Sequence, residues 1–496
     1  MQVTSPDTPL KVHIILRRDQ LRWPSLRFLL DGLTGALSLG QIFAAPDIRG
    51  REGRGVALLA QLERLAMPGA PAAADAAPLP FDPGAIGECD VIVDFRARPA
   101  SADLAGRARA GVWQLSCHDT AQVAGPVMQG ASAFACRLTC RRGGTSGVLA
   151  SAVVQTKVTV AHSQAFASEK SVQMVLRELH RLALTGGLPD LGRLQNARAY
   201  PGLARLPGYA VQVSGRAIRK LKARIPPPRP QPFALRAGPG DLLGFDPASG
   251  WDIEQPADKF RADPFLFERA GAVYCFYEEY PYDTRRGHIS VARLTGNGAE
   301  VLGPALVAPH HLSFPYVFEE GGELFMMPET IQAARIELWR CVDFPLKWEL
   351  HATALEGRQL GDPVLFRQGG DWWLFANSCH DSFGDFSSEL SLYRVDGPEL
   401  NRVVPHPLNP VVVGSDCARS AGRVFHKDGR LYRLSQDNSG DVYGYGLNLM
   451  EITELTDTGY AEHRVRHVTP DQIPGAIGCH HADAAGGMFV VDVRWP

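Results

Sequence analysis

One short pattern occurs five times in the C-terminal half of the 496-residue chain: an apolar stretch, a tight polar turn and a second apolar stretch. The turns contain Ala-Gly, Gly-Gly or Asp-Gly, which suit hairpins where φ becomes positive. Intervals of about fifty residues are too long for one hairpin and fit a four-stranded blade. The pattern therefore predicts an all-β, five-bladed propeller over residues 246–496, with copies that begin at Asp263, Phe314, Asp362, Gly422 and His480.

Polar side chains occupy matching places in these copies: Asp263, Glu329, Asp362, Gln436 and His481. Equivalent places in a propeller surround one axis, so we expect these residues to converge on a central pocket. Glycosyl transfer or hydrolysis needs two carboxyl groups, one to donate a proton and one to stabilise charge or activate a nucleophile. Asp263, Glu329 and Asp362 are therefore the candidate catalytic residues.

Structural roles remain open for the same residues. Asp-Pro at the start of a strand, as at Asp263 and Asp362, is also favourable turn chemistry without any catalytic purpose. Glu278 and Glu279 follow an aromatic strand, and alternation along a strand points only one of them inward. The sequence does not decide which one.

A second group of residues is predicted to bind substrate rather than to react with it. Arginines among carboxylates either pair with them or hold a substrate phosphate or carboxylate, and Arg419 in the ARSAG motif is the strongest candidate for an anion. Aromatic side chains at the channel mouth would stack on sugar rings. The predicted substrate-binding residues are Glu278, His311, Arg419, Arg423, Gln436, Tyr443 and His481.

No metal ligands and no cofactor are predicted. His480 and His481 are adjacent on a predicted strand and face opposite ways, which disfavours a two-histidine metal site. One histidine together with carboxylates could still hold a divalent cation.

The N-terminal third has a different pattern, in which apolar strands alternate with helices. The segments 11–17 and 89–96 are predicted as buried strands, and 22–33 and 169–186 as helices. This alternation predicts an α/β, Rossmann-like domain over residues 1–200. A Pro-rich linker is expected over 201–245, with a stiff polyproline run at 226–232.

Composition narrows the class of protein. The net charge is −2 and apolar residues make up 45% of the chain, which suits a soluble globular protein without a broad basic surface for nucleic acid. No apolar run reaches the eighteen residues of a transmembrane helix, and the N-terminus lacks the pattern of a secretory signal. Nine scattered cysteines without a CxxC motif favour reduced thiols and a cytoplasmic location.

The N-terminal domain resembles the formyltransferase fold of methionyl-tRNA and sugar-nucleotide formyltransferases. The resemblance rests on VIVDF, then GVWQLSCHDTAQVAGP (111–126), then TSGVLASAVVQT (145–156). His118 matches the family's catalytic His, whereas Ser116 stands in place of its Asn and Thr145-Ser146-Gly147 in place of its Asp-x-Gly motif. The resemblance implies a degenerate domain, because both the polarising amide and the acid are missing.

The C-terminal half resembles the N-terminal domain of plant glucosamine inositolphosphorylceramide transferase and its bacterial relatives, and through it the propellers of glycoside hydrolase family 43. The motifs include ADPFLFE, HLSFPYVFE, MMPET, GDPVLF, ARSAGRVF and GCHHAD. The resemblance to family 43 implies that Asp263 is a general base and Asp362 a residue that tunes the acid. Glu329 is the candidate acid, although that family does not place its acid in the second blade.

Three functions follow as hypotheses. The first is a carbohydrate-active enzyme that transfers or hydrolyses a glycosyl unit on a cell-envelope glycan or its precursor, acting on a sugar, sugar nucleotide or glycolipid. The second is a glycan-binding or scaffold protein without catalysis. The third is residual N-formylation of an amino sugar at the N-terminal domain.

Overall fold

The computed structural model describes residues 8–46, 54–65, 78–97, 99–194, 203–222, 233–440 and 442–496. Two compact units make up the chain. The first contains Met1–Pro226 with His380–Gly384, and the second contains Pro227–Cys379 with Asp385–Pro496. No helix among the described residues is long and apolar enough to span a membrane.

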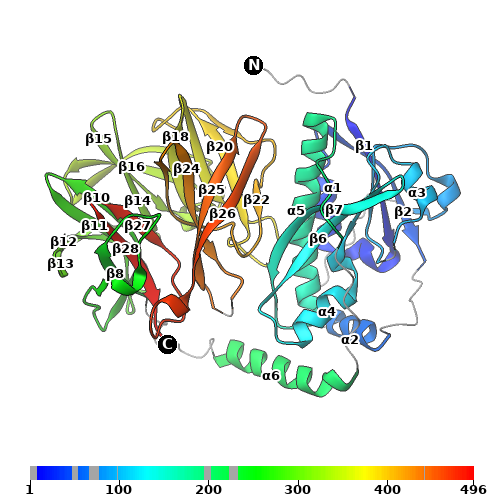
Figure 1. The fold of residues 1–496 in the computed structure, drawn as a ribbon, viewed down its shortest axis with the longest axis horizontal. Helices are drawn as coiled ribbons and strands as arrows, with labels where there is room; N and C mark the ends of the chain where they lie inside the picture. Colours follow the sequence, from blue (N-terminus) through cyan, green and yellow to red (C-terminus); the bar gives the residue numbers. More distant parts are fainter. Residues whose placement is uncertain are drawn as a thin grey trace. The chain divides into compact units, whose positions relative to one another are not determined.

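The first unit is built on a mixed seven-stranded sheet of order β3-β2-β1-β4-β5-β6-β7 (Figure 1). The first five of these strands are parallel, and β6 and β7 are antiparallel, so the expected α/β fold class is confirmed. The strands are β1 (Leu10–Arg17), β2 (Leu37–Ala45), β3 (Leu79–Pro80), β4 (Val91–Asp94), β5 (Val112–Leu115), β6 (Ala133–Arg142) and β7 (Thr145–Gln155).

Six helices are described in this unit. The longest, α5, begins at Val160, well before the expected residue 169, because Thr159 caps it by accepting the N–H of His162. It ends where Gly186 takes a φ of 71°, as the sequence predicted. The helices are α1 (Pro24–Gly32), α2 (Arg54–Leu65), α3 (Ala102–Gly106), α4 (Thr120–Met128), α5 (Val160–Thr185) and α6 (Leu206–Lys222).

The second unit is a five-bladed β-propeller, which confirms the fold class predicted from the repeats. Its first four blades follow the chain in order. They contain β10 (Lys259–Arg269), β11 (Ala272–Pro281), β12 (His288–Thr295) and β13 (Gly298–Leu306); β14 (Ser313–Glu320), β15 (Glu323–Glu329), β16 (Ile336–Asp343) and β17 (Lys347–Ala354); β18 (Gly361–Gln368), β19 (Asp371–Asn377), β20 (Glu389–Val395), β21 (Val403–Pro405) and the short β22 (Val412–Val413); and β23 (Ser420–Lys427), β24 (Arg430–Asp437), β25 (Gly446–Leu455) and β26 (Tyr460–Val468).

The fifth blade joins both ends of the propeller. Its order is β27-β28-β8-β9, so β27 (Ala482–Ala485) and β28 (Met488–Arg494) pair with β8 (Phe233–Pro239) and β9 (Trp251–Asp252). Leu235 and Val490 of this blade share a buried cluster with Leu266 of the first blade, which seals the ring.

The region expected to be a linker, residues 201–245, contains α6 and β8. The strand β8 pairs with the nearby β9 at only two residues, and it gains a partner along its whole length when β28 reaches it from the far end of the chain. The polyproline run at 226–232 lies outside the described residues.

Candidate active site

A bulge interrupts the innermost strand of the first four blades at the same place. The register of the hairpin breaks between Ala262 and Phe265, Ser313 and Tyr316, Gly361 and Val364, and Ser420 and Val424. In the first three blades the bulge holds a residue at positive φ followed by proline: Asp263 (52°), Phe314 (49°) and Asp362 (43°). Positive φ is uncommon for residues with a side chain, so these three bulges are strained and must be held by their surroundings.

Carboxylates from neighbouring blades hold these bulges. The N–H of Asp263 donates to Asp492 Oδ2 at 3.1 Å, and the N–H of Phe314 donates to Asp263 Oδ2 at 3.3 Å. The N–H of Asp362 donates to Glu329 Oε2 at 3.3 Å. The repeats therefore bring their acidic residues to the propeller axis, where each also has a structural role.

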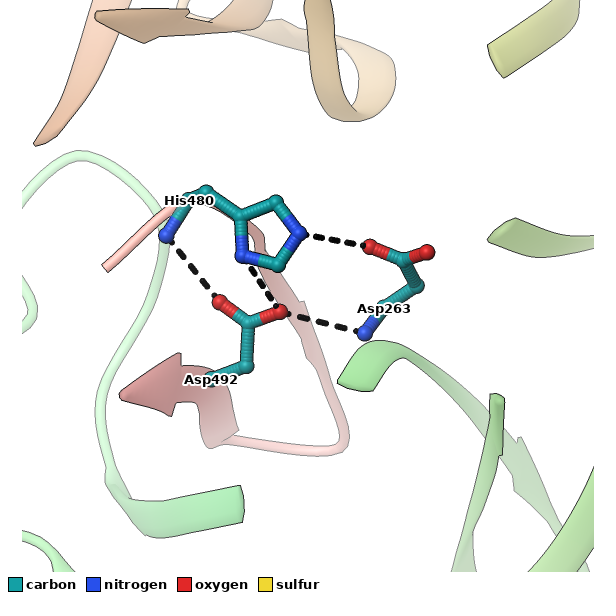
Figure 2. Close-up of side chains that lie close together, drawn as sticks. All are labelled: Asp263, His480 and Asp492. Carbon is teal, nitrogen blue, oxygen red and sulfur yellow. Dashed lines mark hydrogen bonds and ion pairs between the residues drawn. The ribbon is translucent and has the colours of Figure 1, made fainter. Parts of the chain in front are cut away.

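Asp263, His480 and Asp492 form the centre of this arrangement (Figure 2). Nε2 of His480 lies 3.2 Å from Asp263 Oδ1, and its Nδ1 lies 2.9 Å from Asp492 Oδ2. Asp492 also accepts the backbone N–H groups of His480 and His481. All three side chains are buried, so the charge on one must be balanced by the others.

In this triad, ion pairing shifts the pKa values of Asp263 and His480 more than burial does. Burial alone would raise the pKa of Asp263, but the hydrogen bond and charge of His480 lower it to about 2. Burial would lower the pKa of His480, yet Asp492 and Asp263 raise it to about 10. At neutral pH, a protonated imidazole therefore lies beside the ionised carboxylate of Asp263.

The same three groups also have the composition of a divalent-cation site. One ligand atom from each lies within 4.8 Å of the others. The two nitrogens of His480 nevertheless face different carboxylates, which suits a protonated ring, whereas a single ion binds only one ring nitrogen. We therefore treat the cluster as an ion-paired triad.

The stability of this triad should depend on pH. His480 has a pKa of about 10 in the folded protein against an ordinary value of 6.5, so its stabilising effect is complete below pH 6.5 and is lost as pH rises towards 10. The slope is at most about 1.4 kcal/mol per pH unit. Chemical denaturation at a series of pH values should show the free energy of unfolding falling across this window, and His480→Gln should lack that component. A constant difference between the two proteins over the window would contradict the assignment.

Arg419 joins two other predicted catalytic residues. Its Nε lies 2.7 Å from Asp362 Oδ2, and its Nη2 lies 3.1 Å from both Asp362 Oδ1 and Glu329 Oε2. Burial and the charge of Glu329 raise the pKa of Asp362, and Arg419 opposes that rise. We expected Arg419 to hold a substrate anion; the structure instead pairs its Nε and Nη2 with carboxylates of the protein.

Glu278 is the buried acid with the weakest compensation. It lies on β11 opposite Ala262, next to Asp263, with a side chain only 8% exposed. Burial and the charges of Asp263 and Glu329 raise the pKa of Glu278 well above its ordinary value. Glu279 faces the other way, where Lys259 and His288 lower its pKa to about 2 against the effect of burial. The structure thus identifies Glu278 as the inward-facing residue of the pair.

His311 fixes which oxygen of Glu278 carries the proton. Nδ1 of His311 accepts the N–H of Gly287 at 2.9 Å, and burial lowers the pKa of the ring. The neutral ring therefore carries its hydrogen on Nε2, which lies 3.4 Å from Glu278 Oε1. Oε2 of Glu278 remains for the carboxylic hydrogen.

The charges at the axis do not balance if every acid ionises. Five buried carboxyl groups meet there, and among the described residues Arg419 and protonated His480 form ion pairs with them. Ionising all five would leave uncompensated charge in a buried site, which is costly. The raised pKa values of Glu278 and Asp362 reduce this excess, because a protonated carboxyl group carries no charge. The five groups are Asp263, Glu278, Glu329, Asp362 and Asp492.

The other predicted binding residues separate into two groups. Tyr443 is 41% exposed and its ring lies near His480 and Arg419, as expected for a residue at the mouth of the site. Gln436 is bonded through both ends of its amide to Ser420 and Asn438.

His481 and Arg423 lie deeper in the propeller. His481 is fully buried against the rings of Phe265 and Phe314. Arg423 is ion-paired with Asp483 and bonded to the carbonyl of Leu266. Arg423 thus already has partners within the protein, and substrate binding by Arg423 and His481 stays a prediction.

Asp492 is a member of the axial cluster that the sequence analysis did not identify. It lies within the apolar run FVVDV of β28, outside any turn motif. An acidic residue alone in a buried strand requires a partner, and that requirement is the sequence signal that could have identified Asp492.

A cavity of about 340 Å³ lies elsewhere, lined by Gln368, Arg430, Glu451 and neighbouring residues, and shares no residue with the axial cluster.

His118, the histidine that matches the formyltransferase pattern, lies in the core of the first unit. His118 is buried, packs on Phe95 and Trp23, and its Nε2 contacts Ser168 Oγ at 2.9 Å. Burial lowers its pKa to about 3. His118 is thus a core residue, and formyl transfer stays a prediction without support from this environment.

The fold and the axial site define a class: a five-bladed propeller with a buried cluster of carboxyl groups at its centre. Residues 247–477 match the family model described as glucosamine inositolphosphorylceramide transferase 1, N-terminal, which confirms the resemblance expected from the motifs. The chain is 37% identical over 248 residues to glucosamine inositolphosphorylceramide transferase 1 of Arabidopsis thaliana, and 34% identical over 269 residues to the protein of that name from Oryza sativa subsp. japonica. The matches cover 47% and 49% of this chain but only 32% and 36% of those proteins.

Similar solved structures include two glycoside hydrolases. Zg3597, a family 117 glycoside hydrolase from Zobellia galactanivorans, has a TM-score of 0.35 at 11% identity, covering 53% of this chain and 91% of that chain. GH43B from Bacteroides ovatus has a TM-score of 0.31 at 15% identity, covering 41% of this chain and 42% of that chain. Scores this low carry no argument about activity.

Proposed function

We propose that the propeller is a carbohydrate-active domain that transfers or hydrolyses a glycosyl unit, with Glu278 as the proton donor. One observation carries the proposal: Asp263 and Glu278 lie on paired strands and are driven to opposite protonation states. Two carboxyl groups with separated pKa values are the arrangement that glycosidic chemistry uses.

Glu278 fits the role of acid better than Glu329, the residue favoured by the sequence. Glu329 is paired with Arg419 and accepts the N–H of Asp362, so its carboxyl oxygens already have partners within the protein. Glu278 keeps its proton and has an oxygen free of His311 to present it. Glu329 and Asp362 then line the site in positions fixed by their bonds to Arg419.

Asp263 is better suited to stabilise positive charge than to remove a proton. A carboxylate with a pKa of about 2 is a weak base, so it gains little as a proton acceptor at neutral pH. Held between His480 and the N–H of Phe314, it can support an oxocarbenium-like transition state. This role replaces the general base implied by the family resemblance.

The substrate class follows from the comparisons and is part of the proposal. The named relatives are glucosamine inositolphosphorylceramide transferases, and the family model of that name matches residues 247–477, within the propeller. We assign this chain a sugar or glycolipid substrate of that general type. Binding without catalysis is the competing outcome, because the axial carboxylates also hold the bulges.

The test is a turnover assay on the purified chain. Glycosides, sugar nucleotides and phosphoinositol glycolipids would each be incubated with the wild type and with Asp263→Asn, and released or transferred sugar measured by mass spectrometry. Asn keeps an acceptor for Phe314 but removes the charge, so we expect turnover to fall at least about a hundredfold. Substrate-induced thermal shifts with no turnover in the wild type would identify a binding module instead.

A further inference from the structure

A fifty-residue stretch of the chain has an extreme charge. Residues 191–240 contain ten Arg and Lys and no Asp or Glu, although the whole chain has a net charge of −2. The remainder therefore carries −12. A basic segment within an acidic protein attracts anionic surfaces selectively, because the rest of the chain repels them.

The helix α6 lies inside this stretch and is anchored by one face. Tyr209 is buried, accepts the N–H of Val160 at 2.8 Å and donates to Glu63 at 2.6 Å. Arg216 donates to the carbonyl of Lys157 at 3.1 Å. Residues seven apart share a helix face, so Tyr209 and Arg216 define the inward side.

The opposite face of α6 exposes aliphatic side chains. Val211 is 72% exposed and Ile218 is 52% exposed, and their spacing of seven residues places them in one row. Through Glu63, α6 is joined to α2, where Leu58 and Leu62 are 52% and 56% exposed one turn apart. Figure 1 shows α2 and α6 at the same end of the first unit.

We propose that this face of α6, with its apolar row and basic sequence, docks on an anionic lipid bilayer. Aliphatic side chains enter the boundary between headgroups and acyl chains, while Lys and Arg attract anionic headgroups. A nucleic acid fits less well, because the aromatic residue of α6, Tyr209, is turned inward and cannot stack on bases. The inference does not depend on the chemistry assigned to the propeller, although a bilayer is where a glycolipid substrate would be found.

Vesicle flotation of the full chain tests the proposal. We expect the protein to float with phosphatidylcholine vesicles that contain phosphatidylserine, not with phosphatidylcholine alone, and to be released by high salt. Replacing both aliphatic residues, Val211→Ser with Ile218→Ser, should weaken binding about tenfold. The matched control is Val301→Ser with Val307→Ser, two valines of the propeller that are 49% and 63% exposed.

Each outcome decides the question. Circular dichroism of both double variants checks that they remain folded. Failure of the wild type to float with anionic vesicles would overturn the proposal, as would equal flotation of the α6 variant. Binding of a random-sequence DNA duplex that both double variants retain, without flotation, would show that the basic stretch recognises nucleic acid instead. Loss of turnover at the propeller would leave this result unchanged.

Discussion

Glu278→Gln is expected to reduce turnover by roughly 10²–10⁴-fold, the usual contribution of a positioned general acid. Gln keeps the size and polarity of the protonated carboxyl group but cannot release a proton. In the wild type the rate should fall as pH rises past the raised pKa of Glu278, since only the protonated form donates. The residual rate of Glu278→Gln should not show this fall with rising pH.

The stability of Glu278→Gln distinguishes a loss of catalysis from a loss of turnover caused by unfolding. A carboxyl group whose pKa is raised by folding costs stability as pH rises above its ordinary value, and Gln removes that cost. The melting temperature of Glu278→Gln at neutral pH should therefore equal or exceed that of the wild type.

The matched variant is Glu279→Gln, one residue away on the opposite face of β11. It loses ion pairs with Lys259 and Arg261, so we expect a lower melting temperature with turnover retained. If Glu279→Gln abolished turnover and Glu278→Gln did not, the assignment of the acid would be wrong.

Arg419→Gln is expected to destabilise the fold by about 3–5 kcal/mol, because it leaves the buried carboxylates of Glu329 and Asp362 without their cation. Denaturant titration at neutral and acidic pH measures the effect. The loss should shrink at low pH, because burial raises the pKa of Asp362 and its protonated carboxyl group no longer needs the arginine.

A surface pair provides the control for this prediction. Arg340 pairs with Glu323 at 3.2 Å, and their side chains are 40% and 52% exposed, so Arg340→Gln should cost at most about 1 kcal/mol. If Arg419→Gln weakened substrate binding with no loss of stability, Arg419 would be the anion-binding residue that the sequence suggested.

The candidate site was predictable where it follows the repeats. Asp263 and Asp362 share an Asp-Pro place in two copies, and the structure brings both to the axis at positive φ. The direction of Glu278 was not predictable, because Glu278 and Glu279 are both buried and differ only in their neighbours. Asp492 was hidden because its partner Asp263 is 229 residues away and becomes its neighbour only after the ring closes.

By itself, the sequence determined the blades. Each hairpin is a local structure, because its turn glycines and the alternating apolar and polar residues of its strands lie within some twenty residues of sequence. Tertiary structure alone decided how the ring closes through β8 and β28, and which acid keeps its proton. The physical reason is the same for both: strand pairing and pKa depend on groups that are distant in sequence and adjacent in space, and burial at the axis strengthens every charge that meets there.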